Sequence, residues 1–309
     1  MNCLKGLITN ALLTIVQISF ACDLCSSYLG INPHYNKNSI GIRYRESSFL
    51  GEHTHFNDHN HDFSETINST NQSKEVYRTT EIYGRWYPNP KLQLFYTIPF
   101  GRHTEWENRK MQTDYYGIKD VLAIGQFQLI NTIQRDSSQL LHRLLIGGGI
   151  KLPTGTYKKK NSIKVIDPTM QLGSGSLDLM VAGTYLAKYK RLGWSTTITY
   201  SINGKNRINY RFANRLNITS QLFYENKIGK YTVMPSLGIY SELAQRDQWK
   251  EVTQYNTGGK VSFAVIGISL YKNNWAVNFN YLNPVYEYLF GQQGENQARI
   301  TTGVSHAFN

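Results

Sequence analysis

Four of the eight histidines stand together in the segment GEHTHFNDHNHDF, where His53, His55, His59 and His61 flank Asp58. Imidazole and carboxylate groups suit transition metals, so the segment could bind a metal ion, with copper or zinc as the expected one. The spacing is irregular and fixes no tetrahedral site, and a loop loses conformational entropy when it closes around an ion. A solvated polar loop that happens to be rich in histidine is the alternative interpretation.

A second candidate for metal or redox chemistry is the C-x-x-C pair formed by Cys22 and Cys25. A redox pair would sit at the start of a helix, and a zinc site would need a second pair, but the sequence supplies neither. The alternatives are a disulfide between the two cysteines and a small plug segment over residues 22–38. Lipid attachment at Cys22 is a further possibility if a leader is cleaved before it.

Basic residues exceed acidic ones, giving a formal net charge of +12. They are scattered along the chain instead of forming a concentrated patch, so we expect no nucleic-acid binding. The basic residues that alternate with apolar neighbours are Arg43, Arg45, Arg211, Arg215 and Arg299, with Lys151 as a further candidate and Asp178 opposing it. If these positions line a pore, they favour anions. Pairing with lumen acids, or binding of lipopolysaccharide, is the alternative role.

The sequence contains no clear pattern of catalytic residues. A barrel lipase would need a His and a Ser two residues apart near the outer rim, but His142 is followed by Arg-Leu and His306 by Ala-Phe. The GSGS run at residues 173–176 lacks the G-x-S-x-G spacing. We therefore expect no enzyme.

The elements that would position these residues are β-strands with period-two alternation. From Trp194 to Asn203, large apolar residues alternate with Ser, Thr and Asn, and the segments 210–224, 275–281 and 299–309 repeat this pattern. Tilted strands of about ten residues with one face toward lipid and one toward a lumen have this pattern. The fold class we predict is all-β, a transmembrane antiparallel β-barrel.

Extending the pattern predicts twelve strands, with ten or fourteen as alternatives if a loop hides a hairpin. The predicted ranges are 39–48, 76–87, 91–101, 120–132, 140–152, 176–188, 194–203, 210–224, 231–242, 260–271, 275–287 and 298–309. Short turns alternate with long loops between them, as in bacterial barrels with both termini on the periplasmic side. A soluble sandwich would also alternate along its strands, but its turns need not alternate in length.

The first residues, 1–21, combine Lys5, an apolar run and a Ser-x-Ala ending, which predicts a signal peptide. The apolar run is too short for a transmembrane helix. Residues 22–38 then form a periplasmic or plug segment, and residues 39–309 form the barrel. This organisation predicts the outer membrane of a Gram-negative-type cell as the location.

Three segments carry a resemblance to a known family: GIKDVLAIGQFQL at 117–129, GGGIKLPTGTY at 147–157 and DPTMQLGSGSLDLMVAGTYL at 167–186. They resemble the strand-loop-strand signature of outer-membrane transporters first associated with aromatic degradation, the phenol meta-pathway type. The resemblance spans residues 116–224, about a third of the 309 residues. It implies a barrel related to the long-chain fatty-acid transporter group, with no substrate assigned.

The segment CDLCSSYLGI is similar to the Cys-Asp-x-Cys-Gly-Cys run that opens the mature barrels of Bacteroidetes-type bacteria. Ser26 and Ser27 stand where that run has Gly and a third Cys, which weakens any metal role inferred from the resemblance. Farther along, Gly147, Gly148 and Gly149 either leave room for a plug or substrate beside their strand or let the strand bend.

Together these observations predict a channel or transporter for small solutes, anion-preferring and linked to metal handling through the histidine-rich loop. The alternative is a closed structural or surface-binding barrel whose loops bind metal or ligand without transport. The expected partners are outer-membrane lipids, lipopolysaccharide, a small-molecule solute and the barrel-assembly machinery.

Overall fold

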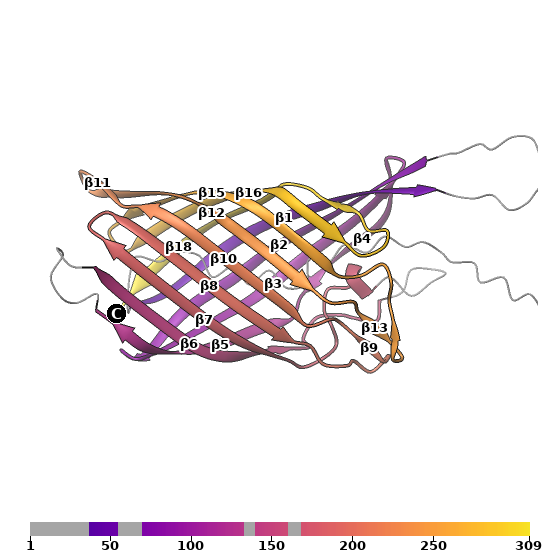
Figure 1. The fold of residues 1–309 in the computed structure, drawn as a ribbon, viewed down its shortest axis with the longest axis horizontal. Coiled ribbons are helices and arrows are strands. Elements are labelled where there is room, and N and C mark those ends of the chain that lie inside the picture. Colours follow the sequence, from indigo (N-terminus) through magenta and orange to yellow (C-terminus); the bar gives the residue numbers. More distant parts are fainter. Residues whose placement is uncertain (1–36, 55–69, 133–139, 160–167) are drawn as a thin grey trace, which may run out of the picture.

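The computed structural model describes residues 37–54, 70–132, 140–159 and 168–309, which form a closed barrel of twelve antiparallel strands (Figure 1). Closure is made by β18 against β1, and every other wall strand pairs with the wall strands before and after it in the chain. The wall consists of β1 (Asn38–Thr54), β2 (Thr70–Asn89), β3 (Leu92–Glu107), β5 (Val121–Asn131), β6 (Leu141–Leu152), β7 (Asp178–Tyr189), β8 (Leu192–Ile202), β10 (Arg215–Tyr224), β12 (Tyr231–Ala244), β15 (Gly259–Lys272), β16 (Trp275–Leu289) and β18 (Arg299–Phe308).

The all-β barrel and its strand number are confirmed, but the predicted strand at 210–224 is wrong at its start. Residues 210–211 form the separate short strand β9 (Tyr210–Arg211), and the wall strand begins only at Arg215. Between them the backbone N–H of Ala213 donates to Asp247 Oδ1 at 2.8 Å instead of to a neighbouring wall strand. Tyr210 and Phe212 are consequently buried beneath the loops, whereas the sequence pattern places them on the lipid face.

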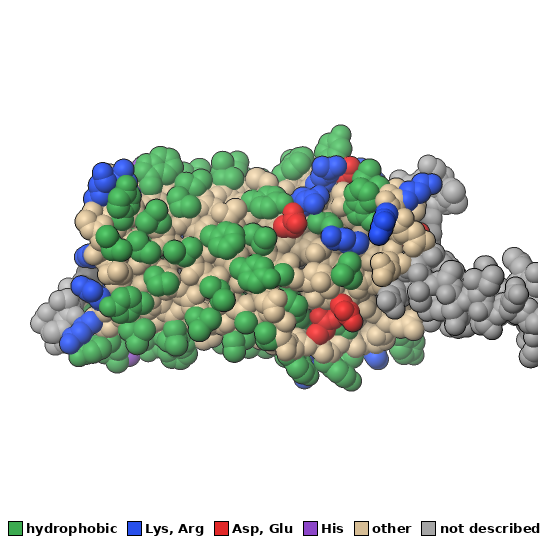
Figure 2. Space-filling view, turned by 90° about the horizontal axis from the view of Figure 1, so that it is seen from above, with side chains coloured by type: hydrophobic (Ala, Val, Ile, Leu, Met, Phe, Trp, Pro, Cys, Tyr) green, Lys and Arg blue, Asp and Glu red, His purple; other side chains and the backbone are tan. Residues whose placement is uncertain are grey.

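The outer surface of the wall is a belt of exposed apolar side chains, seen in green in Figure 2. Alternation accounts for it: on β8, Ile198 is 44% exposed, while the next residue, Thr199, is 1% exposed. The belt ends in aromatic residues near the short turns, including Trp86, Trp194 and Trp275. An apolar band bordered by aromatic residues is the surface that a transmembrane barrel presents to lipid.

The two ends of the barrel differ in their connections. One end has tight turns, such as 190–191 between β7 and β8 and 273–274 between β15 and β16. Lys190 and Asn273 have φ of 52° and 53° there, the left-handed conformation that tight hairpin turns use. β11 (Asn226–Ile228) lies in a longer turn at the same end.

The opposite end carries the long connections. They contain β4 (Lys110–Ile118), which pairs with β3, the short helix η1 (Pro168–Met170), and β17 (Glu295–Asn296), which pairs with β1. A small separate sheet joins β9 to β13 (Gln248–Trp249) and β14 (Val252–Thr253). In bacterial barrels the long loops face the outside, so we refer to this end as the outer mouth. Over the described residues, no helix has the length and apolar character needed to cross a membrane.

Candidate functional site: the lumen and its outer mouth

The first cluster of charge in the lumen is built around Glu81 on β2. Its carboxylate forms an ion pair with Arg43 Nε and lies 3.5 Å from Arg45 Nη2, both on β1. Thr97 on β3 donates a hydrogen bond of 2.8 Å to Glu81 Oε2. Arg43 also lies over the ring of Tyr83, with 5.0 Å from Cζ to the ring centroid. One carboxylate therefore fixes two guanidinium groups against the inner wall.

These side chains reach the lumen because period two turns them away from lipid. Arg43 follows Ile42, which is 53% exposed on the outer face, whereas Arg43 itself is 5% exposed. The register pairs Arg43 with Glu81 directly across the β1–β2 ladder, and a directly opposed pair of opposite charges stabilises the register. The cluster thus lies at the level of the lipid-facing belt.

A second cluster lies nearer the outer mouth, where Arg299 on β18 meets Glu242 on β12. Arg299 Nη1 is 2.7 Å from Glu242 Oε1, and its Nη2 donates to Asn296 Oδ1 at 2.7 Å. The Arg299 Cζ lies 4.2 Å from the centroid of the Phe263 ring. Because its two terminal nitrogens bind two different residues and its plane contacts a ring, this arginine is held in one orientation.

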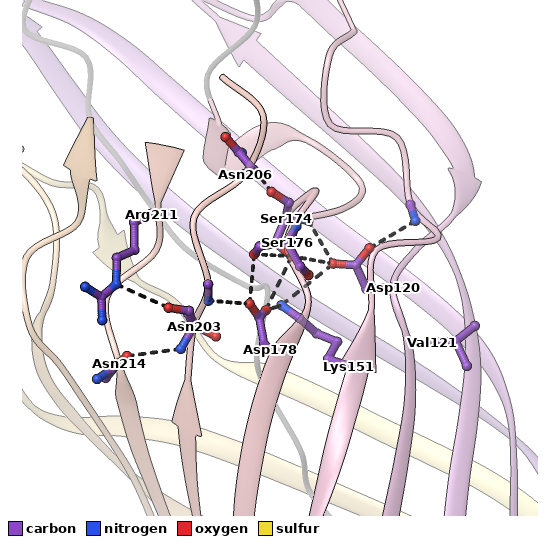
Figure 3. A network of polar contacts seen from close by, with 12 residues as sticks. Asp120, Val121, Lys151, Ser174, Ser176, Asp178, Asn203, Asn206, Arg211 and Asn214 are labelled. Atoms are coloured by element: carbon purple, nitrogen blue, oxygen red, sulfur yellow. Dashed lines mark hydrogen bonds and ion pairs between the residues drawn. The ribbon is translucent and has the colours of Figure 1, made fainter. Parts of the chain in front are cut away.

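The outer mouth contains a buried ion triad (Figure 3). Lys151 Nζ, at the end of β6, is 2.6 Å from Asp178 Oδ2 at the start of β7 and 3.7 Å from Asp120 Oδ2 just before β5. All three side chains are buried. Buried charges cost free energy unless they are paired and hydrogen-bonded, so this arrangement requires further polar partners.

Those partners come from the loops that fold over the mouth. Asp120 accepts hydrogen bonds from the backbone N–H of Gly155 at 3.0 Å and of Ser174 at 2.8 Å. Asp178 accepts from Ser176 Oγ and from the backbone N–H of Gly204, both at 2.8 Å. The two carboxylates therefore fasten the segments 153–159, 168–177 and 203–214 to the wall. Figure 3 shows these loops converging on the triad.

This network accounts for much of the sequence signature. Asp120 ends the GIKD run, Lys151 and Gly155 belong to KLPTG, and Ser174 and Asp178 belong to GSGSLD. Gly173 is needed for its size, because a Cβ there would lie 2.6 Å from Asp120 Oδ1 and 2.7 Å from the backbone of Gly155. The resemblance thus rests on residues that connect the wall to its loops.

A third buried carboxylate, Asp247, fastens the loop that follows β12. Its Oδ2 accepts a hydrogen bond of 2.7 Å from the Tyr210 hydroxyl, and its own N–H donates to Thr257 Oγ1 at 2.8 Å. Burial raises the pKa of Asp247 above its usual value, and the nearby positive charge of Arg215 partly offsets the effect. The loop is thus anchored by a carboxyl whose ionised form is penalised.

The glycine run on β6 has a packing role. A Cβ on Gly147 would lie 1.9 Å from the carbonyl oxygen of Gly125, and one on Gly149 would lie 2.3 Å from that of Ala123. Only glycine allows the backbones of β5 and β6 to approach so closely. Close packing of the β5 and β6 backbones is therefore the role that the structure shows for Gly147 and Gly149.

Five of the six basic residues proposed for the lumen point inward and are buried or half-buried: Arg43, Arg45, Arg215, Arg299 and Lys151. Arg211 does not. It is exposed on β9, where its Nε donates to the carbonyl of Asn203 at 3.2 Å, because the chain leaves the wall after Ile202. It borders an open polar pocket of about 290 Å³ between the loops, which Lys205, Gln248 and Glu251 also line.

Sequence reasoning missed the acids that accompany these cations. It named Asp178 as opposing Lys151, which agrees with the observed ion pair, but not Glu81, Glu242 or Asp120. Glu81 and Glu242 were detectable, because each stands at the same alternation phase as buried inward neighbours, Thr79 and Tyr240. Asp120 precedes its strand, so no alternation marks it.

The candidate metal ligands remain untested. His53 lies near the end of β1, where its backbone pairs with that of Asn71. The remaining candidates lie outside the described residues: His55, His59, His61, Asp58, Cys22 and Cys25. Within the described ranges, no group of three or more His, Cys, Asp and Glu side chains could hold an ion. Most of the segment 22–38 and all of the predicted signal peptide 1–21 also lie outside them.

Comparison with solved structures identifies the fold. The chain is similar to the COG4313 outer membrane channel from Pseudomonas putida F1, with a TM-score of 0.63 at 12% identity over 90% of this chain and 100% of that one. The translocator domain of autotransporter NalP from Neisseria meningitidis gives 0.43 at 11% identity, over 89% and 90%. The TodX monoaromatic hydrocarbon channel deltaS2 mutant gives 0.39 at 10% identity, over 89% and 90%. The likeness to the Pseudomonas putida channel, with its TM-score of 0.63, shows that the chain has the fold of an outer-membrane β-barrel.

No protein-family model and no curated protein matches the chain.

Proposed function

We propose that the chain forms an outer-membrane channel for small solutes. The observation that carries this proposal is the contrast across the wall: apolar side chains cover the outer face, while ionised groups line the inner face at the same level. Such a wall suits a bilayer outside and a polar path inside. The signal peptide at 1–21, the barrel-assembly machinery and lipopolysaccharide as a partner belong to the same proposal.

The channel we propose prefers anions. At the level of the belt, the described wall places Arg43 and Arg45 around the single carboxylate of Glu81. Fixed charges on a pore wall set ion selectivity, so a wall with more guanidinium than carboxylate groups favours anions. The proposal includes the resemblance to phenol meta-pathway-type barrels and the second resemblance to barrels of Bacteroidetes-type bacteria. Neither resemblance assigns a natural solute.

The alternative is a closed barrel whose loops bind metal or ligand without transport. It is favoured by the burial of inward side chains, with Thr79 and Gln126 each only 1% exposed, and by the polar loop pocket beside Arg211. Swelling of proteoliposomes in isotonic neutral sugars of increasing size distinguishes the two. Swelling with the smallest sugar and none with a disaccharide fits a narrow channel. No swelling with any sugar, despite verified insertion, contradicts the channel.

The anion preference is tested by substituting Arg43→Gln together with Arg45→Gln. We expect the ratio of chloride to potassium permeability to fall toward unity or below it, because Glu81 then carries the local charge. Arg78→Gln is the matched control, since Arg78 pairs with Glu46 on the outer face at 2.8 Å and lies off the path. An unchanged ratio in the double variant would contradict the assignment.

We also propose that the histidine-rich loop binds copper or zinc at the outer mouth, on the strength of its ligand types alone. Deletion of residues 52–62 should abolish metal binding to the refolded barrel and leave solute flux intact. Unchanged metal affinity would remove the basis for this role. The absence of enzymatic activity stays a prediction.

A further inference from the structure

The short-turn end of the barrel carries a collar of exposed positive charge, visible as the blue groups at the left of Figure 2. Its members are Lys91, Lys190, Arg191, Lys227, Lys230 and Lys272. The described residues of these turns include one acidic side chain, that of Glu225, which is half-buried and forms an ion pair with Lys188. The collar is therefore strongly cationic.

Two exposed cations of the outer mouth, by comparison, have a carboxylate partner. Arg102 pairs with Asp114 at 2.8 Å, and Lys205 pairs with Glu251 at 2.7 Å. In the described part of the chain, Lys230 and Lys272 have no carboxylate partner within ion-pair distance. Exposed charges without a carboxylate partner are available to a ligand of opposite charge.

Two of these lysines converge on one aromatic ring. Lys230 Nζ and Lys272 Nζ lie 5.8 Å and 5.5 Å from the centroid of Tyr231. The ladder pairs Tyr231 with Lys272, and Lys272 with Trp275, across three neighbouring strand ends. Trp275 is 55% exposed on the lipid face. Ammonium groups, a tyrosine and a tryptophan thus meet where the apolar belt ends.

We propose that Lys230 and Lys272, with Tyr231 and Trp275, form a binding site for the phosphate of an anionic phospholipid in the periplasmic leaflet. Aromatic side chains at the edge of the belt lie at headgroup level, so the acyl chains of a bound lipid would lie along the belt. The lysine ammonium groups would meet its phosphate, since basic clusters beside a membrane attract anionic headgroups. An anionic phospholipid fits this site because its phosphate complements the lysines and its acyl chains complement the apolar belt.

The test uses the full chain refolded in nanodiscs of phosphatidylcholine with increasing phosphatidylglycerol. Quenching of tryptophan fluorescence by brominated lipids of each class measures which lipid contacts the wall. We expect wild type to prefer phosphatidylglycerol by at least about five-fold, the scale of one lysine beside anionic lipid. Lys230→Gln with Lys272→Gln should reduce that preference to less than two-fold.

Lys205→Gln with Lys250→Gln at the outer mouth is the matched control and should keep the wild-type preference. A gel shift on heating in detergent confirms that each variant is folded. Equal lipid preference in both double variants would overturn the site. Loss of the preference when inorganic phosphate is added at constant ionic strength would also overturn it, because the ligand would then be free phosphate.

Discussion

The two ends of this barrel use lysine side chains in different environments. At the outer mouth, lysine and aspartate are buried together and hold loops by hydrogen bonds, as Lys151, Asp178 and Asp120 do. At the short-turn end, lysines stay exposed beside tyrosines, as Lys190 does beside Tyr189 with 5.3 Å to the ring centroid. Buried ion pairs therefore stabilise the long loops of the outer mouth, whereas the basic residues of the collar stay exposed at turns too short to enclose them.

The largest effect in this comparison should come from Asp178→Ala. The substitution removes the nearer of the two carboxylates that pair with the buried ammonium of Lys151, the other being Asp120 at 3.7 Å, and it removes the acceptor for the Gly204 N–H. Breaking a buried pair costs roughly 3–5 kcal/mol, which we expect as lost stability in urea unfolding.

The matched change at the other end is Glu225→Ala, which removes the partner of the half-buried Lys188. Water reaches that ammonium, so its loss of stability should be much smaller. Equal losses for the two variants would contradict the contrast between the ends.

A smaller effect is expected from Gly147→Ala. Its new Cβ would overlap the carbonyl oxygen of Gly125 at 1.9 Å, and such overpacking typically costs about 1–3 kcal/mol. Gly183→Ala is the control, since its Cβ would have only the carbonyl oxygen of Leu145 nearby, at 4.0 Å. If urea unfolding shows both variants to be as stable as wild type, β5 and β6 do not need the close approach.

The next effect concerns pH at the mouth. Burial raises the pKa of Asp247 above that of the same carboxyl in an unfolded chain. In the window between those two pKa values the folded loop binds more protons than the unfolded one, so its stability rises as pH falls. Relative to Asp247→Asn, wild type should therefore show slower proteolysis of loop 245–258 on acidification. An identical pH profile in the two proteins would mean that Asp247 does not titrate in this way.

The smallest effect should come from Glu251→Gln. The Lys205–Glu251 pair is exposed, with side-chain exposures of 48% and 74%, and exposed pairs contribute little because water screens them. We expect the midpoint of urea unfolding to stay within experimental error of wild type. A clear loss would show that the loop pocket needs this pair for its structure.

The fold was predictable because alternation and connection length are local properties of the sequence. On β8, for example, the residue types alone predict that Ile198 faces outward and Thr199 faces inward, whichever strand lies beside them. The failure at 210–214 has a physical cause: Tyr210 and Phe212 keep the alternation of a strand, but Asp247, far along the chain, takes their backbone out of the wall.

The lumen was only partly predictable for a related reason. Arg43 and Arg299 were identifiable as inward cations. The pairing of Arg43 with Glu81 depends on the register of β1 against β2, and that of Arg299 with Glu242 spans the width of β15 and β16. The ties between Asp120, Gly155 and Ser174 depend on loop conformation, for which period two gives no signal.

The most direct test of the account is the reversal potential of the refolded wild-type barrel in a planar bilayer under a potassium chloride gradient. We predict a steady current whose reversal potential has the sign of chloride selectivity, because Arg43 and Arg45 line the wall around one carboxylate. A cation-selective current, or silence despite verified insertion, would contradict an anion-preferring channel.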